Sequence, residues 1–508
     1  MNRSLRDYAS LVLSQGVRIP LGILSMTILA RLLGPDGLGK WSMGIAVATL
    51  FHAALLNWTQ SSHIRFGREE WVERRSLSGT WAARWPFVVA GLLFSSVALL
   101  LNPGNWLTTI SGLGDGWGGL VLLCLFSLWV SAEAQSLLQV TDRIGLLAML
   151  PSVVGFATAG YYASLLATDV RSPAIVLAGF VGIQIVVWGV TWLALYRKAG
   201  RFAVAPRSAA VRTHLRYAWP MLPGFAIGYA SNWGDHLLLQ HFFTSREVGL
   251  FQSAYRPMLL IMGLATPLTT VLLPRLIAQQ MADLEAETRF VRKVVPTITS
   301  LWAFLLAPAI ALLPWGFQTL MGDSFAPAVP ILLVLCIGVP ACVLTNLFTV
   351  LFSVQKRLGR SVLLLLAMTG VNLGLSVALL PILGPIGAAV GTAASYLLVQ
   401  FLYVWDQHRY LKISALPMLG LFFWLTTYSV VQALLGAGGP EWATLTIRVG
   451  WTAAWMVGLL LIVRRGRLVD PDVLDRMFTG SLSQAGRLAS ATMVRKCDTV
   501  IGPMRVSL

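Results

Sequence analysis

The sequence predicts an all-α membrane protein, a polytopic bundle of about fourteen transmembrane helices in two pseudo-repeated lobes. Three observations support this fold class. Apolar residues make up 56% of the 508 residues and charged residues only 12%, which lies outside the range of soluble chains. Apolar segments of about twenty residues, the length that spans a bilayer, follow one another from Tyr8 to Val463. The short connectors between them are rich and poor in Lys and Arg in alternation.

The apolar runs are too long and too unalternating for the strands of a membrane barrel. With the N terminus inside the cell, about thirty-one of the 38 Lys and Arg residues fall on the inner side. Both termini are therefore expected in the cytoplasm, and the first segment is expected to remain as a helix because it is too long for a signal peptide. The predicted spans are residues 8–33, 37–58, 85–102, 117–140, 145–168, 173–196, 216–242, 247–274, 294–316, 326–353, 361–383, 385–405, 414–436 and 443–463.

The second half of the chain resembles the first. Residues 32–41 align without a gap with residues 242–251, and residues 5–8 align equally well with residues 215–218. Any two apolar hairpins share some likeness, but repeated halves are typical of transporters that alternate access to a central site. The predicted units are an N-terminal lobe at 1–215 with helices 1–6, a C-terminal lobe at 216–405 with helices 7–12, helices 13 and 14 at 406–464, and a basic cytoplasmic tail at 465–508.

Composition excludes several classes of function. A net charge of +17 would suggest nucleic-acid binding in a soluble chain, but here the basic residues flank apolar spans, so anionic lipids are the expected partners and nucleic acid is not. Residues 61–84 mix apolar and Arg residues and predict an amphipathic segment on the inner leaflet. The cysteines show no metal-ligand spacing, and no nucleotide-binding loop is visible. We therefore expect no metal, no cofactor and no enzymatic activity.

Two motifs resemble a known family. The stretch Ile28-Leu29-Ala30-Arg31-Leu32-Leu33-Gly34-Pro35-Asp36-Gly37-Leu38-Gly39 is similar to the first-hairpin signature of polysaccharide-synthesis flippases, a branch of the multidrug/oligosaccharidyl-lipid/polysaccharide exporter superfamily. Asn372 followed by Leu380-Pro381-Ile382-Leu383-Gly384-Pro385-Ile386-Gly387-Ala388-Ala389-Val390-Gly391-Thr392 resembles the family's eleventh and twelfth helices. Lys40 departs from the apolar residue expected after the hairpin glycine. The Asn-Arg-Arg-Leu-Phe type of signature of peptidoglycan-precursor flippases does not occur.

The resemblance covers most of the chain up to about residue 405. It implies transport of lipid-linked sugars across a bacterial cytoplasmic (inner) membrane, as in O-antigen or exopolysaccharide synthesis. The substrate would be a lipid-linked glycan, and a polysaccharide polymerase or synthase is an expected partner.

Charged side chains at the middle of a bilayer cost at least about 2.5–3.5 kcal/mol, so each one is a candidate site residue. Arg18 lies in the first span, and Gln252, Tyr255 and Arg256 share one face of the eighth. Two arginines, one per lobe, could converge on a central cavity and bind the anionic linkage of a polyprenyl pyrophosphate glycan. Alternatively, Arg18 extends to inner lipid head groups and Arg256 pairs with a carboxylate.

A second group of polar residues suggests ion coupling. Asn232, Asp235 and His236 in the seventh span are spaced i, i+3 and i+4, so we expect them on one face. An Asp beside a His can exchange a proton near neutral pH, and H+ or Na+ are the candidate ions. Alternatively, this cluster lies near the outer interface, where water satisfies it. Glu133 in the fourth span could bind a cation, pair with Arg256, or form a polar contact between helices.

The sequence therefore predicts a flippase that moves a polyprenyl-(pyro)phosphate-linked oligosaccharide or polysaccharide repeat unit from the inner to the outer leaflet by alternating access. The alternative is a cation-coupled multidrug or metabolite exporter on the same scaffold, in which Glu133 and Asp235 would matter more than the arginines. A membrane-embedded sugar polymerase or glycosyltransferase is disfavoured, because no outer connector is long enough to hold a catalytic acid or base set.

Overall fold

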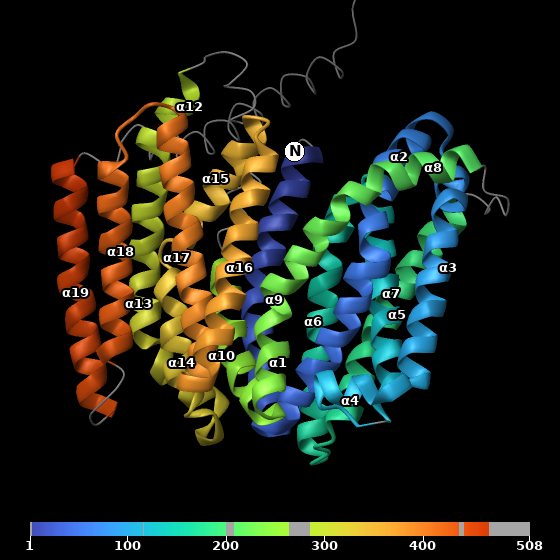
Figure 1. Cartoon of the computed structure of the whole chain (residues 1–508), viewed down its shortest axis with the longest axis horizontal. Coiled ribbons are helices and arrows are strands. Elements are labelled where there is room, and N and C mark those ends of the chain that lie inside the picture. The colour runs from blue at the N-terminus through green and yellow to red at the C-terminus, as the bar shows by residue number, and fades with distance from the viewer. Residues whose placement is uncertain (1–2, 115, 200–207, 264–284, 436–440, 467–508) are drawn as a thin grey trace, which may run out of the picture.

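A computed structural model describes residues 3–114, 116–199, 208–263, 285–435 and 441–466. These residues form helices and connecting turns, with no β-strand among them. The predicted all-α fold class is therefore confirmed. Most of the long helices lie side by side with their axes roughly parallel or antiparallel, as in a membrane bundle (Figure 1). The predicted basic tail lies outside the described residues from residue 467 onward.

In the first half of the chain, α1 (Arg3–Phe51) contains the first predicted span and most of the second. They meet at Gly34, whose φ of 63° and ψ of −179° interrupt the helix directly before Pro35, a conformation that favours glycine. This confirms the predicted turn between two long helices. After α1 come a π-helix, η1 (His52–Leu56), and a 3-10 turn, η2 (Asn57–Thr59). The remaining helices of this half are α2 (Gln60–Arg74), α3 (Ser78–Leu101), α4 (Trp106–Ser111), α5 (Trp117–Val140), α6 (Ile144–Ala167), α7 (Pro173–Ala199) and α8 (Ser208–Ala218).

In the second half, one predicted span is broken. Helices α14 and α15 are bent by 41° at a break that contains Pro340, a residue without the backbone N–H needed to continue a helix. The helices of this half are α9 (Leu222–Phe242), α10 (Ser245–Gly263), α12 (Ala286–Arg289), α13 (Val295–Met321), α14 (Ala328–Leu335), α15 (Cys342–Val354), α16 (Leu358–Leu383), α17 (Pro385–Tyr410), α18 (Leu416–Leu435) and α19 (Glu441–Gly466).

Ten described helical stretches are long and apolar enough to cross a membrane, or eleven if the bent pair α14–α15 counts as one span. The first stretch covers residues 16–74 and contains two predicted spans. Helices α9 and α10 fall where the seventh and eighth spans are predicted, but side chains such as Asp235 and Arg256 make them more polar. The chain is a multi-pass membrane protein, and its helices are roughly consistent with the predicted fourteen.

The first hairpin connects the two halves. Helix α1 packs against α10 and α6. The Arg31 guanidinium donates hydrogen bonds to the carbonyls of Thr319 (2.9 Å) and Leu320 (2.8 Å) in the last turn of α13. Lys40, the departure from the family motif, pairs with Asp36 one turn earlier at 2.8 Å.

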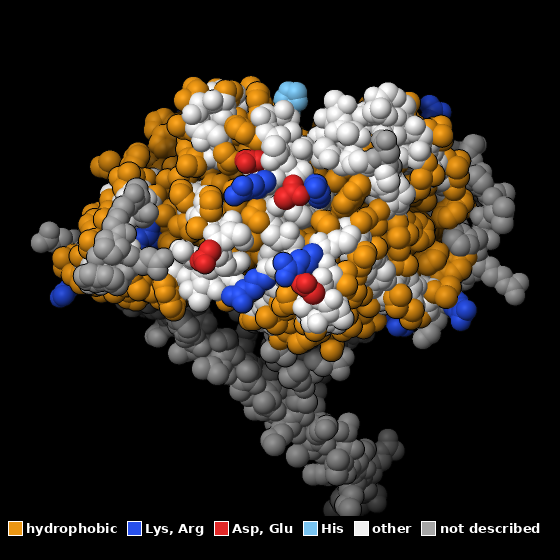
Figure 2. Space-filling view, turned by 90° about the horizontal axis from the view of Figure 1, so that it is seen from below, with side chains coloured by type: hydrophobic (Ala, Val, Ile, Leu, Met, Phe, Trp, Pro, Cys, Tyr) orange, Lys and Arg blue, Asp and Glu red, His pale blue; other side chains and the backbone are white. Residues whose placement is uncertain are grey.

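The end of the bundle opposite the N terminus is seen in Figure 2. Acidic and basic side chains are interspersed near its middle, and hydrophobic side chains surround them. At this end the exposed ion pairs Asp36–Lys40 and Asp169–Arg171 lie within single turns. This mixed surface differs from the Arg-rich connectors predicted for the inner side.

The segment predicted to be amphipathic, residues 61–84, does not form one surface helix. Helix α2 ends at Arg74, and α3 begins at Ser78. Arg84, predicted to lie in an inner connector, is therefore inside α3, with a side chain only 2% exposed. Helices α2 and α8 lie together at the end that holds the N terminus (Figure 1), where the Phe66 and His214 rings are 4.7 Å apart.

Candidate transport site

A cavity of about 400 Å³, referred to below as the central cavity, lies where the first hairpin meets α9 and α10. One wall comes from the end of α1 and the distorted segment that follows it, and the other two come from α9 and α10. The described lining residues include amides, hydroxyls and aromatic rings but no carboxylate. They are Thr49, Ala53, Asn57, Gly224, Phe225, Gly228, Tyr229, Asn232, Trp233, Gln252, Tyr255, Arg256 and Leu259.

The predicted face of the eighth span lines this cavity. Gln252, Tyr255 and Arg256 follow one another at helical spacing on α10, so all three side chains reach the same space. Gln252 accepts a hydrogen bond from His236 on α9, while its amide nitrogen has no partner among the described residues. That nitrogen is a buried donor without a described acceptor, next to the cavity.

Arg256 has no counter-ion in the part of the chain that the structure describes. No ion pair of Arg256 occurs among those residues, and the residues that line its cavity include no Asp or Glu. Of the two alternatives, the pairing of Arg256 with a carboxylate is therefore not observed. Among the described residues, the positive charge at the wall of this cavity has no compensating carboxylate.

Arg18 lies in a different cavity. This second space, of about 360 Å³, is formed by α1, α6 and α10, and its lining includes Ser25, Pro151, Leu259 and Leu260. Leu259 lines both cavities, so the two spaces are neighbours along α10. The two arginines therefore line separate, neighbouring cavities in this structure, and the expected convergence on one cavity is not observed.

Asp235 is buried between α9 and the hairpin formed by α16 and α17. Its carboxylate accepts hydrogen bonds from Asn372 Nδ2 (3.0 Å), Ser376 Oγ (2.8 Å) and Thr392 Oγ1 (2.7 Å). These donors are all buried. Two of them, Asn372 and Thr392, belong to the second family motif. The motif residues and the predicted coupling residue thus form one site.

Glycines in that motif allow the close approach of α16 and α17. A Cβ on Gly391 would lie 2.6 Å from Ser376 Oγ and 3.0 Å from the Asn372 carbonyl. A Cβ on Gly387 would lie 2.6 Å from the Leu379 carbonyl. Because no side chain separates the helices, Ser376 and Thr392 can both reach Asp235.

The predicted cluster of Asn232, Asp235 and His236 does not act as one face. Asp235 points to α16 and α17, and His236 points to α10, where its ring contacts those of Phe251 and Tyr255. Asn232 instead lines the central cavity and donates to the Gly228 carbonyl at 2.7 Å. The i, i+3 and i+4 spacing distributes the three side chains over a broad part of the helix surface. Different parts of this surface face α10 and the pair α16 and α17, so the side chains have different neighbours.

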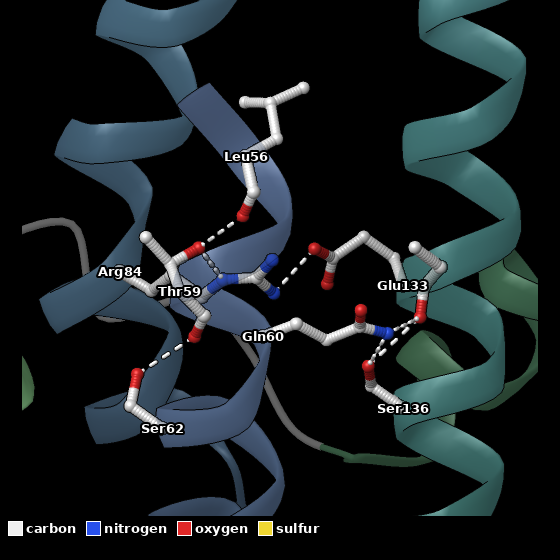
Figure 3. Close-up of polar contacts among 8 residues, drawn as sticks. Leu56, Thr59, Gln60, Ser62, Arg84, Glu133 and Ser136 are labelled. Atoms are coloured by element: carbon white, nitrogen blue, oxygen red, sulfur yellow. Dashed lines mark hydrogen bonds and ion pairs between the residues drawn. The ribbon is translucent and has the colours of Figure 1, made fainter. Parts of the chain in front are cut away.

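Glu133 pairs with Arg84 of α3 and not with Arg256 (Figure 3). Neither residue lines either of the two cavities. The sequence interpretation missed Arg84 because it lies among other arginines in the printed chain. Its position between Trp81 and Trp85, next to an apolar run, is the signal that could have placed it in the bundle.

Comparisons with known proteins agree with this architecture. A family profile described as polysaccharide biosynthesis protein matches residues 153–281, a stretch that includes Asp235, Gln252 and Arg256. The resemblance to the polysaccharide-synthesis family is confirmed. No curated protein matches the chain in sequence.

Solved structures show the same fold at low sequence identity. The lipid II flippase MurJ in an inward closed conformation superposes with a TM-score of 0.70 and 14% identity, covering 90% of this chain and 99% of that chain. The MATE multidrug transporter DinF-BH in complex with R6G superposes with a TM-score of 0.53 and 12% identity, covering 80% and 94%. This chain therefore has the fold of membrane transporters.

Proposed function

We propose that this protein is a flippase that moves a polyprenyl-(pyro)phosphate-linked oligosaccharide or polysaccharide repeat unit from the inner to the outer leaflet of a bacterial cytoplasmic membrane. The observation that supports this most strongly is Arg256, a cation that has no counter-ion among the described residues and lines a cavity whose described lining has no carboxylate. A charge inside a membrane needs a partner or water. The pyrophosphate of a lipid-linked glycan supplies such a partner, because guanidinium matches phosphate oxygens bidentately.

The remaining lining suits the sugar part of this substrate. Asn57, Asn232 and Gln252 offer amide donors and acceptors, and Trp233 offers an aromatic face. Arg18 lies in the neighbouring cavity, whose lining is mostly apolar. We therefore assign Arg18 to the lipid-proximal part of the anionic linkage, with the polyprenyl tail remaining in the bilayer.

We further propose Asp235 as the coupling-ion site, for H+ or Na+. Its carboxylate faces the hydroxyl oxygens of Ser376 and Thr392, and the Asn372 amide oxygen has no partner among the described residues. Oxygen-rich sites between packed helices are typical of ion-coupled transporters. His236 joins α9 to the cavity residue Gln252, which gives this site a physical connection to the substrate cavity.

The alternative, export of cationic drugs, receives less support from this geometry. Arg256 would repel a cation in the cavity. Asp235 and Glu133, the carboxylates that such an exporter would use, lie outside the lining of both cavities.

The test is mass spectrometry of lipid extracts from cells with the gene, without it, and with the Arg256→Gln variant. We expect polyprenyl pyrophosphate glycans to accumulate on deletion and in Arg256→Gln. A further variant, Arg256→Lys, keeps the positive charge and should accumulate a smaller amount. Arg246→Gln is the matched control, because Arg246 is exposed on the first turn of the same helix. Unchanged glycolipids together with new sensitivity to cationic compounds would favour the exporter.

A further inference from the structure

A buried ion pair lies in the first half of the bundle, away from both cavities. Arg84 Nη1 contacts Glu133 Oε1, and these side chains are only 2% and 0% exposed. Arg84 also donates from Nε to Thr59 Oγ1 at 2.8 Å. The three residues come from α3, α5 and η2 (Figure 3). Removing the charge of one partner leaves the other charge buried and uncompensated, which is strongly destabilising. The local structure is therefore sensitive to the loss of either charge.

Thr59 connects this pair to the wall of the central cavity. Its hydroxyl donates to the Leu56 carbonyl at 2.7 Å, and Leu56 is the last residue of the π-helix η1. Ala53 and Asn57, from the same distorted segment, line the cavity. A π-helix marks a local departure from regular α-helical bonding and is frequent at functional sites. One side of the segment therefore contacts the ion pair, and another side forms the cavity wall.

Gln60 makes a second connection between this segment and α5. Its amide nitrogen donates to the Ala132 carbonyl (2.8 Å) and to Ser136 Oγ (2.7 Å). These acceptors lie on either side of Glu133 in the sequence of α5. A change at Glu133 would thus be passed to the distorted segment through Arg84 and Thr59. Gln60, which directly follows Thr59, holds that end of the segment against α5.

Other titratable groups surround the pair. Glu70 of α2 is already occupied, because its carboxylate accepts hydrogen bonds from the backbone N–H groups of Gly79 and Thr80, both at 2.8 Å. Burial lowers the pKa of His214 on α8 to about 4, so this side chain is neutral near neutral pH. The side chains that interact electrostatically with Arg84 are Glu133 of α5, His52 of η1, His63 of α2 and His214 of α8.

We propose that Glu133 is a second proton-binding site of the transporter, separate from Asp235, and that it controls the shape of the cavity wall at residues 52–57. A proton on the carboxylate removes its negative charge and weakens its hold on Arg84. The hydrogen bond from Arg84 to Thr59 then changes, and with it the hydrogen bond from Thr59 to the Leu56 carbonyl. Arg84 and Thr59 are positioning residues. The inference depends on the proposed function only in treating the cavity as the transport path.

The experiment measures cavity access without any substrate. In the full chain with its native cysteines replaced, Asn57→Cys reports on the cavity wall and Glu73→Cys, on an exposed part of α2, serves as the reference. Maleimide labelling in lipid vesicles is compared at about pH 6 and about pH 8, where a coupling carboxylate changes charge. We expect the Asn57→Cys rate, relative to the reference, to change several-fold with pH. Glu133→Gln should label at both pH values like the parent at low pH.

A double variant separates a coupling role from a structural one. Glu133→Gln leaves Arg84 buried without a counter-ion and destabilises the fold, whereas Arg84→Met combined with Glu133→Leu replaces the pair by apolar groups, an exchange that is often neutral. We expect this double variant to fold as well as the parent and to lose the pH response. A pH response that persists in it would overturn the proposal, as would a parent without one.

Three controls should keep the pH response. His52→Gln and His63→Gln test the neighbouring imidazoles. Asp406→Asn removes the ion pairs with Arg357 (3.0 Å) and Arg360 (2.8 Å) in the other half. Loss of the response in a histidine variant would assign the proton site to that residue instead. Because no glycolipid is needed, failure of the flippase proposal would show in the lipid extracts and not in this assay.

Discussion

Helices α1 and α10 cross at Gly39 and Gly249, where their backbones are in contact. The two glycines occupy equivalent positions in the two aligned hairpins. A Cβ on Gly39 would overlap the Ser245 carbonyl, and a Cβ on Gly249 would overlap the Pro35 carbonyl. Pro35 and Ser245 are themselves equivalent in the alignment. The contact between α1 and α10 is therefore the same on both sides, as a pseudo-two-fold relation between the halves requires.

Replacing either glycine should separate the two hairpins. In Gly39→Ala the new methyl group meets a backbone carbonyl, which no side-chain rotation can relieve, so α1 and α10 must move apart. We expect a lower melting temperature of the purified protein and loss of glycan export. Gly160→Ala on α6, with nothing within 4 Å of the new Cβ, is the control and should be stabilising by about 0.5–1 kcal/mol. Normal melting and export in Gly39→Ala would contradict the crossing.

Arg31 should stabilise the contact between α1 and α13. It donates to two carbonyls at the end of α13, where a cation also interacts favourably with the helix dipole. Arg31→Gln is expected to lower stability by about 1–2 kcal/mol, measured by thermal unfolding in detergent. Arg171→Gln, whose partner Asp169 is exposed and two residues away, should have almost no effect. Equal effects of the two variants would refute this role for Arg31.

Asp235→Asn should remove ion coupling while the protein still folds. The amide is similar in shape but has no charge, so a transported cation loses its ligand, and the donors of Ser376 and Thr392 lose a charged acceptor. In vesicles, we expect transport that no longer responds to an imposed H+ or Na+ gradient. Ser376→Ala removes only one of three hydrogen bonds and should reduce coupling without abolishing it. A gradient response in Asp235→Asn equal to the parent's would exclude this site.

Gly391→Ala should affect Asp235 from a distance. The added methyl would lie 2.6 Å from Ser376 Oγ, so α17 must shift away from α16 and carry Thr392 with it. We expect reduced ion coupling with the carboxylate itself unchanged. Gly374→Ala on α16 is the control, because nothing lies within 4 Å of its new Cβ. Full coupling in Gly391→Ala would show that the close packing of these helices is not needed.

Residues of the two family motifs show which features of the structure the sequence predicts and which it does not. The turn at Gly34 and the helix pair around Gly384 were predictable, because a glycine with positive φ followed by proline ends one helix and begins another. Asn372 and Thr392 could be recognised as motif residues, but their common partner, Asp235, could not. The distance between residues 235, 372 and 392 in the chain is bridged only when α9 packs on α16 and α17.

By itself, the amino-acid sequence determined the all-α fold class, the approximate spans and the shared face of Gln252, Tyr255 and Arg256, because hydropathy and helical periodicity are local properties. Only the tertiary structure decided that Glu133 meets Arg84, that Asp235 and His236 face different helices, and that Arg18 and Arg256 line separate cavities. The physical reason is that helices in lipid are apolar around most of their circumference. Their rotation is then set by close packing and by a few polar contacts, which local sequence does not specify.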